Sequence, residues 1–529
     1  MQNRLTAVLT AFLLALTICG AALRFINLGA KEFWHDECET ALVLSGHSER
    51  ELTEYLSHGP VSCASLSKFQ KVGEASTLSN MYKVLREDEP GHAPLFYIFE
   101  YLFCLLLGSS PLTMRLVAAL FSTMQLPAVY WLAKEIYSSK TAALFTTSLA
   151  ALSPLLIYYA QEARDYSLGL LLMYLSSALL LYALRTNEKR AWIAYGATIT
   201  LGLYAWLFMG IVVLSQAAFM LFSKWRWRQG WLPFGRSTLL AALLFVPWLC
   251  HMQGNRENFA RIHDWLQERV GLVPLLLAWE AIPAKAFAIY GELTKEMEQT
   301  LAILTFLCLA AIAAAIFLSL KNRKILLPLL LVLAWILAFA VPDATYGGIR
   351  SIYQRHQTPV LAAILLIFPA LILLLWSNKR LLLKIVSLAI AAWVLNCEIV
   401  SSWHLIKAPV WPTKAIRLRD QLPCAQVIKA DQSAGVICQQ ETTNIGEILA
   451  LSHALRADTT LLFVANGSKI EEQSLVSSPG RRFYLFNPSP KCEDELALKG
   501  YTLQPVAAVH HLRTIEPPVL SPAPKSNCH

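Results

Sequence analysis

Two adjacent acids follow the first apolar run of the chain at a place where acid–base chemistry could occur. The segment 25–42 reads FINLGAKEFWHDECETAL and carries Asp36 and Glu37 shortly after the apolar run 5–24. A tryptophan and a histidine precede the pair, so a titratable imidazole stands beside the two carboxylates. Such a carboxylate can act as a general base. The alternative is the solvated start of a loop.

A second charged cluster lies in the short turn between two later apolar runs. The segment SPLLIYYAQEARDYSLGLLL carries Glu162, Arg164 and Asp165 within that turn. Charges beside a membrane are costly, and they mark either function or mutual pairing. A local ion pair that closes the turn therefore stays open as the alternative to a role in a site.

Two basic clusters stand directly before further apolar runs. His92 precedes the run that begins PLFYIFEY, while Arg350, Arg355 and His356 precede the late run TPVLAAILLI. Arginine presents a planar fork of donors that suits phosphate, so these residues are candidates for binding an anion. The alternatives are a structural histidine and arginines whose charged ends reach water from the lipid boundary.

The acids could also hold a metal ion. Asp36, Glu37 and Glu162 offer the oxygen ligands that Mg²⁺ prefers, provided that they converge in space. No CxxC spacing in the sequence indicates a zinc site. We therefore expect no required metal or other cofactor, with a divalent cation at these three acids as the alternative.

The composition indicates which elements position these residues. Of the 529 residues 56% are hydrophobic and 15% charged, against about 25% charged in soluble domains. Repeated long apolar runs predict a polytopic α-helical membrane protein with about 11–13 transmembrane helices. The net charge of +9 comes from short basic clusters between these runs, which argues against a nucleic-acid partner.

The basic clusters predict the orientation in the membrane. Cytoplasmic loops are enriched in Lys and Arg, which places the N-terminus and four clusters inside. All candidate residues then fall on the outer side. The alternation of sides also requires that one of the apolar runs 93–109 and 112–133 is too short to cross or re-entrant, or that the turn KEIYSSK does not lie on the inner side. The predicted inner clusters are 184–190, 223–236, 321–324 and 377–380. The predicted outer segments include two long loops, 25–92 and 252–299.

The chain is expected to have three parts. Residues 1–403 form the transmembrane domain, 404–515 a small extracytoplasmic α/β domain, and 516–529 a disordered tail. The α/β domain is predicted from a pattern of strand, helix, strand and strand after the last apolar run. An extracytoplasmic position permits disulfides, and a bond between Cys424 and Cys438 is the favoured pairing.

Taken in chain order, the motifs resemble those of the GT-C glycosyltransferases. FINLG…FWHDE, HAPLFYIF, SPLLIYYAQEARDYSL and YQRHQTPVLAAILL carry the likeness over about residues 1–400. The branch most similar is that of the bacterial proteins like dolichyl-phosphate-mannose protein mannosyltransferases. The resemblance implies a polyprenyl-phosphate-sugar donor, an active site on the extracytoplasmic face and a place in the bacterial cytoplasmic (inner) membrane.

The resemblance also implies roles for the candidate residues. Asp36 matches the family's catalytic base and Glu37 its acidic neighbour, while Asp165 departs from the family, which often has an apolar residue there. The residues expected to bind substrate or phosphate are His92, Glu162, Arg164, Asp165, Arg350, Arg355 and His356.

The function implied is transfer of a sugar to a hydroxyl of a lipid, glycan or protein acceptor on the outer face, with inversion at the anomeric carbon. Two other classes stay open: a transporter or flippase for lipid-linked sugars, and a polymerase or ligase of the O-antigen type. Transporters more often show repeated halves and broken mid-membrane helices. The charges here gather in long outer loops, which favours an enzyme.

Overall fold

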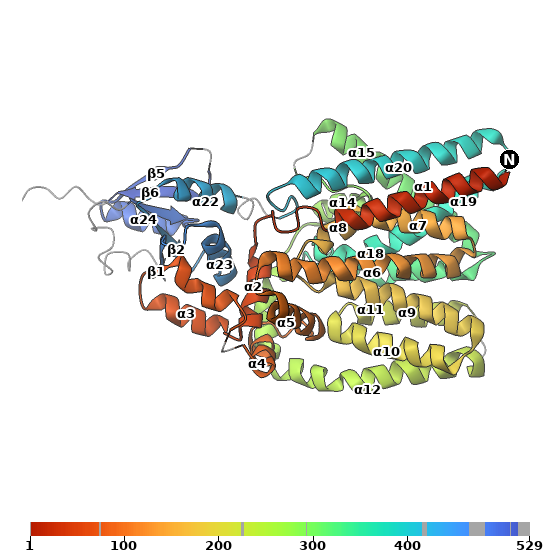
Figure 1. The fold of residues 1–529 in the computed structure, drawn as a ribbon, viewed down its shortest axis with the longest axis horizontal. Helices are drawn as coiled ribbons and strands as arrows, with labels where there is room; N and C mark the ends of the chain where they lie inside the picture. The colour runs from red at the N-terminus through yellow and green to blue at the C-terminus, as the bar shows by residue number, and fades with distance from the viewer. Residues whose placement is uncertain are drawn as a thin grey trace, which may run out of the picture. The chain divides into compact units, whose positions relative to one another are not determined.

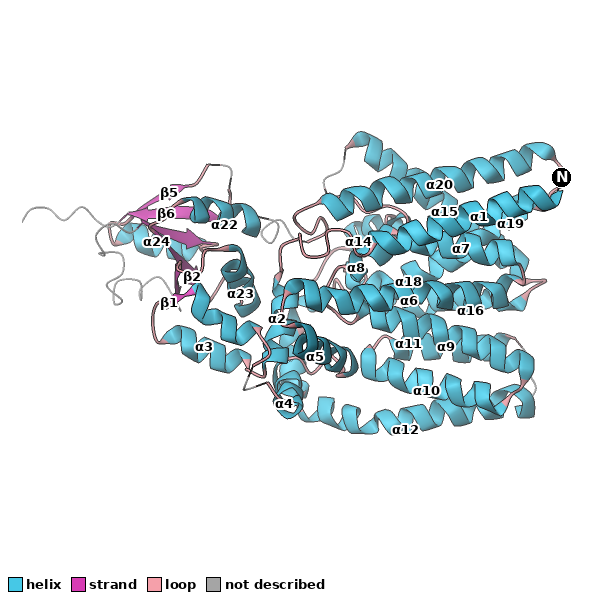
Figure 2. Ribbon diagram, in the orientation of Figure 1, coloured by secondary structure: helices cyan, strands magenta, loops and turns pink. Residues whose placement is uncertain are grey.

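The computed structural model describes residues 2–73, 76–223, 227–291, 294–414, 420–464, 482–507 and 509–516. The chain divides into two compact units. The first comprises Met1–Lys31 and Tyr82–Thr413, and the second comprises Glu32–Met81 and Lys414–His529. The described strands all belong to the second unit, whereas the first is built of helices (Figure 2).

The first unit is a bundle in which the long helices lie roughly along one direction (Figure 1). Its longer helices are α1 (Gln2–Leu23), α5 (Leu95–Leu107), α6 (Pro111–Tyr137), α7 (Lys140–Leu152), α9 (Tyr166–Thr186), α10 (Lys189–Ala205), α11 (Met209–Phe222), α12 (Leu232–Gly254), α15 (Lys295–Ser319), α16 (Leu326–Trp335), α18 (Gln354–Ile367) and α20 (Leu381–Lys407). Shorter elements are α4 (Leu78–Asp88), α8 (Pro154–Ala160), η2 (Trp227–Trp231), α13 (Arg256–Ile262), η3 (Asp264–Gln267), α14 (Leu272–Glu280), η4 (Pro283–Ala286), η5 (Arg323–Ile325), η6 (Ile336–Ala340), α17 (Val341–Tyr346) and α19 (Pro369–Trp376).

The predicted polytopic membrane fold is confirmed, with fewer spans than expected. In the described part of the chain 8 helices are long and apolar enough to cross a membrane, or up to 9 if the bent pair α7 and α8 forms one span. The predicted count of 11–13 was higher because three apolar runs form helices of only 13, 17 and 14 residues, α5, α10 and α11. At 1.5 Å per residue, α5 is too short for a hydrocarbon core of about 30 Å. Of the two apolar runs 93–109 and 112–133, the first is therefore the one that is too short to cross the membrane.

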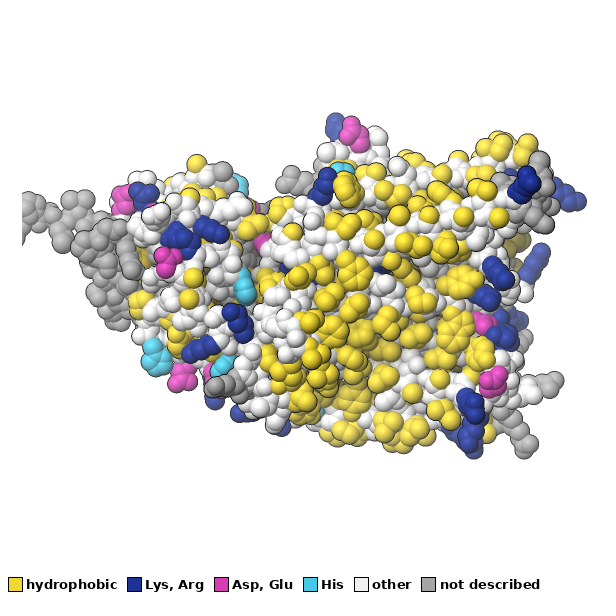
Figure 3. Space-filling view, in the orientation of Figure 1, with side chains coloured by type: hydrophobic (Ala, Val, Ile, Leu, Met, Phe, Trp, Pro, Cys, Tyr) yellow, Lys and Arg dark blue, Asp and Glu magenta, His cyan; other side chains and the backbone are white. Residues whose placement is uncertain are grey.

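The surface of the bundle suits a lipid environment. Hydrophobic side chains cover most of the face drawn in Figure 3. Several large apolar residues are highly exposed on this surface, such as Leu106, which is 81% exposed, and Phe306, which is 69% exposed. A soluble protein rarely exposes a continuous apolar surface of this extent, so lipid contact explains it.

Ion pairs show which connections share one end of the bundle. Glu135, near the end of α6, accepts hydrogen bonds from Nη2 of Arg185 at 2.7 Å and from its Nε at 3.1 Å. Lys324 Nζ lies 3.6 Å from the same carboxylate. The connections that follow α6, α9 and α15 therefore lie together, as the predicted set of cytoplasmic loops requires, and Lys and Arg side chains gather at one end of the bundle in Figure 3.

A fully buried arginine fixes the bend that leads into the charged turn. Arg24 Nη1 donates to the carbonyls of Gly20 at 2.6 Å and Ala151 at 2.7 Å, and its Nη2 donates to that of Ala150 at 3.0 Å. The last carbonyls of α7 need such donors because the helix ends there. The axis of the following helix, α8, is bent by 55° from that of α7. A Cβ on Gly20 would lie 2.4 Å from the Ala151 oxygen, so only glycine permits this approach.

The second unit contains a six-stranded mixed sheet of order β1-β3-β2-β4-β6-β5. Strands β3, β2 and β4 are parallel, and β1, β6 and β5 pair antiparallel with their neighbours. The strands are β1 (Val61–Ser62), β2 (Ala434–Gln439), β3 (Thr460–Val464), β4 (Arg482–Phe486), β5 (Thr502–Pro505) and β6 (Leu512–Glu516). The helices of this unit are α2 (His35–Ser45), α3 (Glu49–Ser57), η1 (Cys63–Gln70), α22 (Gln421–Ala430), α23 (Ile445–Ala454) and α24 (Pro490–Leu498). The predicted order of strand, helix, strand and strand corresponds to β2, α23, β3 and β4.

The observed division differs from the predicted one. The segment Glu32–Met81 was placed in an outer loop of the transmembrane domain, but it folds with the C-terminal part. The reason is pairing over a long sequence distance: Val61 in β1 lies opposite Leu461 in β3, and α2 packs on α23.

Two further expectations concern the C-terminal part. The predicted disulfide between Cys424 and Cys438 is wrong, because both are free, buried thiols. The predicted disordered tail, 516–529, lies outside the described residues except for Glu516, which ends β6.

Candidate functional site

The turn between α8 and α9 is buried although it is rich in charge. The side chains of Glu162, Arg164 and Asp165 are 1–5% exposed. Arg164 Nη2 lies 2.8 Å from Nε2 of His92, whose Nδ1 lies 2.5 Å from a carboxylate oxygen of Glu89. The structure therefore brings the predicted residues His92 and Arg164 together from separate parts of the sequence.

The contact with Arg164 defines the role of one ring nitrogen of His92. A guanidinium can only donate, so Nε2 of His92 accepts the hydrogen bond from Arg164. Burial raises the pKa of Asp165, while the charges of His92 and Arg164 act in the opposite direction.

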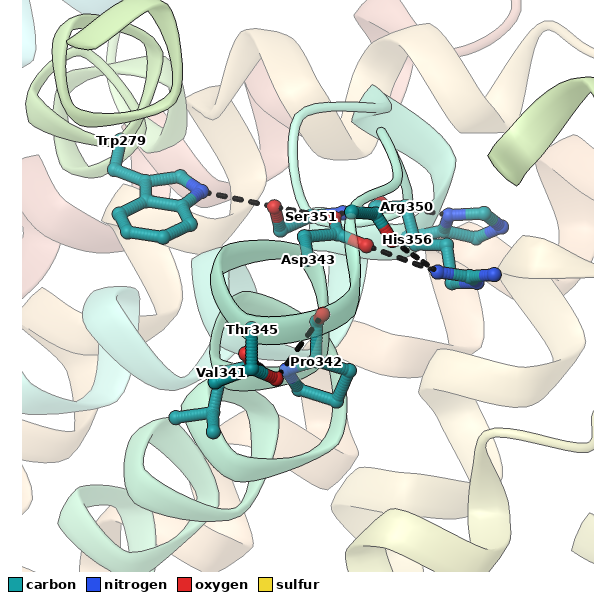
Figure 4. A network of polar contacts seen from close by, with 9 residues as sticks. Trp279, Val341, Pro342, Asp343, Thr345, Arg350, Ser351 and His356 are labelled. Atoms are coloured by element: carbon teal, nitrogen blue, oxygen red, sulfur yellow. Dashed lines mark hydrogen bonds and ion pairs between the residues drawn. The ribbon is translucent and has the colours of Figure 1, made fainter. Parts of the chain in front are cut away.

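A second network holds the loop between α17 and α18, which Figure 4 shows from close by. Asp343 is buried and accepts hydrogen bonds from the backbone N of Ser351 at 2.6 Å, its Oγ at 2.7 Å and Arg350 Nη1 at 3.1 Å. Trp279 Nε1 donates to the Ser351 hydroxyl at 2.8 Å. Gly347 and Gly348 have φ values of 85° and 136°, which other residues rarely adopt. The loop that carries Arg350 is thus tightly constrained.

Two further predicted residues, Arg355 and His356, lie in the first turn of α18 and have different environments. The guanidinium of Arg355 lies 5.4 Å from the ring centres of Trp265 and Tyr353, a geometry typical of cation–π contact. His356 stacks on Phe339 with ring centres 5.4 Å apart, and its Nδ1 lies 2.8 Å from the Arg350 carbonyl. These contacts indicate that His356 holds the loop, and its predicted role in substrate binding stays a prediction.

The charged turn and the start of α18 both lie near His263. A Cβ added to Gly91, the residue before His92, would lie 3.2 Å from Cε1 of His263. The guanidinium of Arg355 faces Trp265, two residues after His263. Burial lowers the pKa of His263, the charges of His92 and Arg355 lower it further, and a hydrogen bond to the Phe259 carbonyl opposes this. A basic cluster of His92, Arg164, His263 and Arg355 thus lies at one end of the first unit. The sequence analysis did not include His263.

A lysine that the sequence analysis also missed extends the network of Asp343. Lys285, in η4, donates from Nζ to Gln357 Oε1 at 3.3 Å, and Gln357 Nε2 donates to the Ser351 carbonyl at 3.0 Å. Burial lowers the pKa of Lys285 to about 8. The feature of the sequence that could have indicated this residue is that it is the one lysine in the apolar segment AIPAKAFAIY.

The depressed pKa of Lys285 predicts how stability depends on pH. Below about pH 8 the amine is charged in both the folded and the unfolded state, and the cost of burying the charge is complete. Between about 8 and the ordinary value of 10.5 the folded protein releases the proton first, so stability rises with pH over this window. The full effect is at most about 3 kcal/mol. In detergent, the melting temperature of the wild type should rise between pH 7.5 and 10, and that of the Lys285→Met variant should not show this rise. An equal rise of the melting temperature in both proteins would contradict the assignment to Lys285.

The acid pair lies in the second unit, in the first turn of α2. Asp36 is 4% exposed, and its Oδ1 lies 2.7 Å from Nε2 of His35. Glu37 is fully buried, and its Oε2 accepts a hydrogen bond from the backbone N of Trp34 at 3.3 Å. Glu37 thus stabilises the start of the helix, as a third residue of a capping box does. Lys414 Nζ lies 3.1 Å from the centre of the Trp34 ring system.

The described residues hold no group of three or more His, Cys, Asp and Glu side chains that could bind a metal ion. Asp36 and Glu37 belong to the second unit and Glu162 to the first. A divalent cation shared by these three acids therefore stays a prediction.

Residues 91–251 match the family model of the dolichyl-phosphate-mannose-protein mannosyltransferases. This stretch includes His92 and the whole charged turn, and it ends in α12. No curated protein matches the chain by sequence.

The fold is shared with a protein of known structure. The chain is similar to ArnT from Cupriavidus metallidurans, solved in the apo state and bound to undecaprenyl phosphate, with a TM-score of 0.53, 13% identity and coverage of 96% of this chain and 98% of that one. An Archaeoglobus fulgidus oligosaccharyltransferase matches with a TM-score of 0.47 and 14% identity over 76% of this chain, which spans 61% of that protein. The comparisons confirm the predicted family resemblance and the predicted fold.

Proposed function

We propose that this chain, which carries the match to the dolichyl-phosphate-mannose-protein mannosyltransferases and has the fold of ArnT, is a membrane glycosyltransferase that takes its sugar from a polyprenyl-phosphate donor. The observation that carries the proposal is the basic cluster at one end of an apolar bundle, where Arg164 contacts His92, His263 lies beside Gly91, and Arg355 faces Trp265. A donor of this type keeps its isoprenoid tail in lipid while its phosphate lies at the boundary, where cationic side chains can bind it.

The reaction needs one group for the leaving phosphate and one for the acceptor proton. As the bond from the anomeric carbon to the phosphate oxygen breaks, the arginines stabilise the negative charge that develops on the polyprenyl phosphate. The acceptor oxygen forms the new bond to that carbon from the opposite side, and its proton passes to the Asp36 carboxylate. A single displacement of this kind inverts the anomeric centre.

The proposal requires Asp36 and the arginines to act on the same sugar. Lys31 ends the first segment of the first unit, Met1–Lys31, and its Nζ donates to Gln161 Oε1 at 3.0 Å and to the Leu405 carbonyl at 2.7 Å. Gln161 begins the charged turn. Asp36 follows Lys31 so closely in sequence that a fully extended chain would place their Cα atoms at most about 18 Å apart. Covalent connection alone therefore supports access of Asp36 to this region.

We propose that transfer takes place on the extracytoplasmic face of the bacterial inner membrane. The basic connections around Glu135 suit the cytoplasm under the positive-inside rule, and the charged turn belongs to the opposite ends of the same helices. The acceptor is then a hydroxyl of a lipid, glycan or protein on that face.

A donor screen tests the proposal directly. The purified protein in nanodiscs is incubated with several polyprenyl-phosphate sugars and with envelope lipid, glycan and protein fractions as acceptors. We expect one donor to be consumed, with release of polyprenyl phosphate and formation of an inverted glycosidic bond. Movement of a labelled donor across proteoliposomes without its consumption would instead identify a flippase. Joining of preassembled lipid-linked glycans would identify a polymerase or ligase.

A further inference from the structure

Helix α2, which carries the acid pair, is built into the same compact unit as the C-terminal sheet. It packs against α23, and nine of its side chains are buried, among them Asp36 and Glu37. Gln70 Nε2 donates to the Cys38 carbonyl at 3.1 Å, and its Oε1 lies 3.2 Å from His453 Nε2 in α23. The acidic helix is therefore held by residues from the distant end of the chain.

The closest approach between the two helices occurs at a glycine. A Cβ added to Gly446 would lie 2.9 Å from the backbone oxygen of His35, 3.0 Å from its Cβ and 3.1 Å from Oε1 of Glu39. A backbone oxygen cannot rotate away as the end of a flexible side chain can. Any side chain at this position must therefore displace one of the two helices.

The start of α23 is anchored by hydrogen bonds within its own first turn and from α22. Asn444 Oδ1 accepts from the backbone N of Glu447 at 2.7 Å, and Glu447 Oε2 accepts from the backbone N of Asn444 at 3.0 Å, which completes a capping box. Gln421 Nε2, from α22, donates to the Glu447 carbonyl at 2.9 Å. A displacement caused by a side chain at position 446 therefore reaches the first turn of α2, where His35 lies.

We infer that the C-terminal sheet domain positions the acidic helix for catalysis, and that Gly446 is the positioning residue through which α23 sets the place of Asp36. The inference rests on the proposed function, in which Asp36 is the base. The His35 carbonyl that would meet the new Cβ belongs to the peptide bond that continues into Asp36. The His35 ring also lies against the Asp36 carboxylate, with Nε2 2.7 Å from Oδ1.

This assignment differs from recognition of an acceptor by the C-terminal domain. A positioning domain acts on the reaction step, because misplacing a catalytic group by about 1 Å can cost about 10²-fold in rate. Donor affinity should stay unchanged, since the proposed phosphate partners all belong to the first unit.

The test is the Gly446→Ala variant of the full chain. We expect kcat for transfer to fall by about 10-fold or more, with an unchanged KM for the polyprenyl-phosphate sugar. The melting temperature should fall by no more than a few degrees, because the higher helix propensity of alanine offsets part of the strain that the added Cβ causes. Gly73→Ala is the matched control: this glycine belongs to the same unit, and an added Cβ there meets nothing within 4 Å.

Hydrogen exchange of the α2 amides gives a second readout that does not depend on activity. We expect faster exchange across α2 in Gly446→Ala than in Gly73→Ala. Normal kcat and normal exchange in Gly446→Ala, in a protein that Asp36→Asn inactivates, would overturn the inference and leave the proposed function intact. A wild-type protein that transfers no sugar would contradict the proposed function. Hydrogen exchange of the α2 amides would then be the measurement that decides whether α23 positions α2.

Discussion

The Asp36→Asn variant is expected to transfer sugar about 10²–10⁴-fold more slowly than the wild type, the usual contribution of a general base. Asparagine keeps the size of the side chain and can still contact His35, which lies 2.7 Å from the carboxylate. It cannot take the acceptor proton at neutral pH. The loss should therefore appear in kcat, with the fold and the melting temperature retained.

The measurement compares initial rates of polyprenyl-phosphate release with and without acceptor. Asp458→Asn is the matched control, because this acid belongs to the same unit and its side chain is 77% exposed. Near-normal turnover of Asp36→Asn would show that another group takes the proton. A parallel loss of melting temperature would point to a structural role of Asp36.

The Arg355→Gln variant should lose about 10²–10³-fold in kcat/KM, the range seen when one preorganised donor to a developing oxyanion is removed. The guanidinium lies 5.4 Å from each of two aromatic ring centres, of Trp265 and Tyr353. This cradle holds the charge in a defined position with little loss of entropy on binding. Glutamine keeps polarity but cannot stabilise the charge on the departing phosphate.

Steady-state kinetics over a range of donor concentrations measure this loss. Arg323→Gln is the control at the opposite end of the bundle, next to Lys324 and its contact with Glu135. An equal loss in both variants would indicate a general effect of removing a positive charge. Restoration of activity by Arg355→Lys would show that charge alone, without the fork of donors, is sufficient.

Features that depend on local pattern could be predicted from the sequence. Long apolar runs predicted the spans, because hydrophobicity over a helix length decides insertion irrespective of the partner helices. Alternation and β-branched content predicted β2, β3 and β4, and the capping residue Asn444 with Glu447 marks the start of α23. Charged residues directly beside apolar runs indicated His92, Arg164 and Arg355.

Features that depend on pairing between distant segments could not be predicted from the sequence. Strand β1 has two residues, and its partner Leu461 lies far along the chain, so nothing near Val61 predicts a strand. Asp343 lies within an apolar stretch, and its contacts with Ser351 and Arg350 follow only from the turn at two glycines. The capping role of Glu37 was hidden for a different reason: the sequence offered a second acid beside Asp36, and chemistry alone favoured a catalytic pair.

The most direct test of the central claim is a cryo-electron microscopy structure of the protein in nanodiscs with a bound, non-transferable polyprenyl-phosphate sugar. We predict that Arg355 and Arg164 contact the phosphate oxygens. The Asp36 carboxylate should lie on the opposite side of the anomeric carbon, leaving space for an acceptor hydroxyl within about 3 Å of both. A bound sugar that Asp36 cannot approach, or a phosphate held away from both arginines, would contradict the proposed transfer reaction.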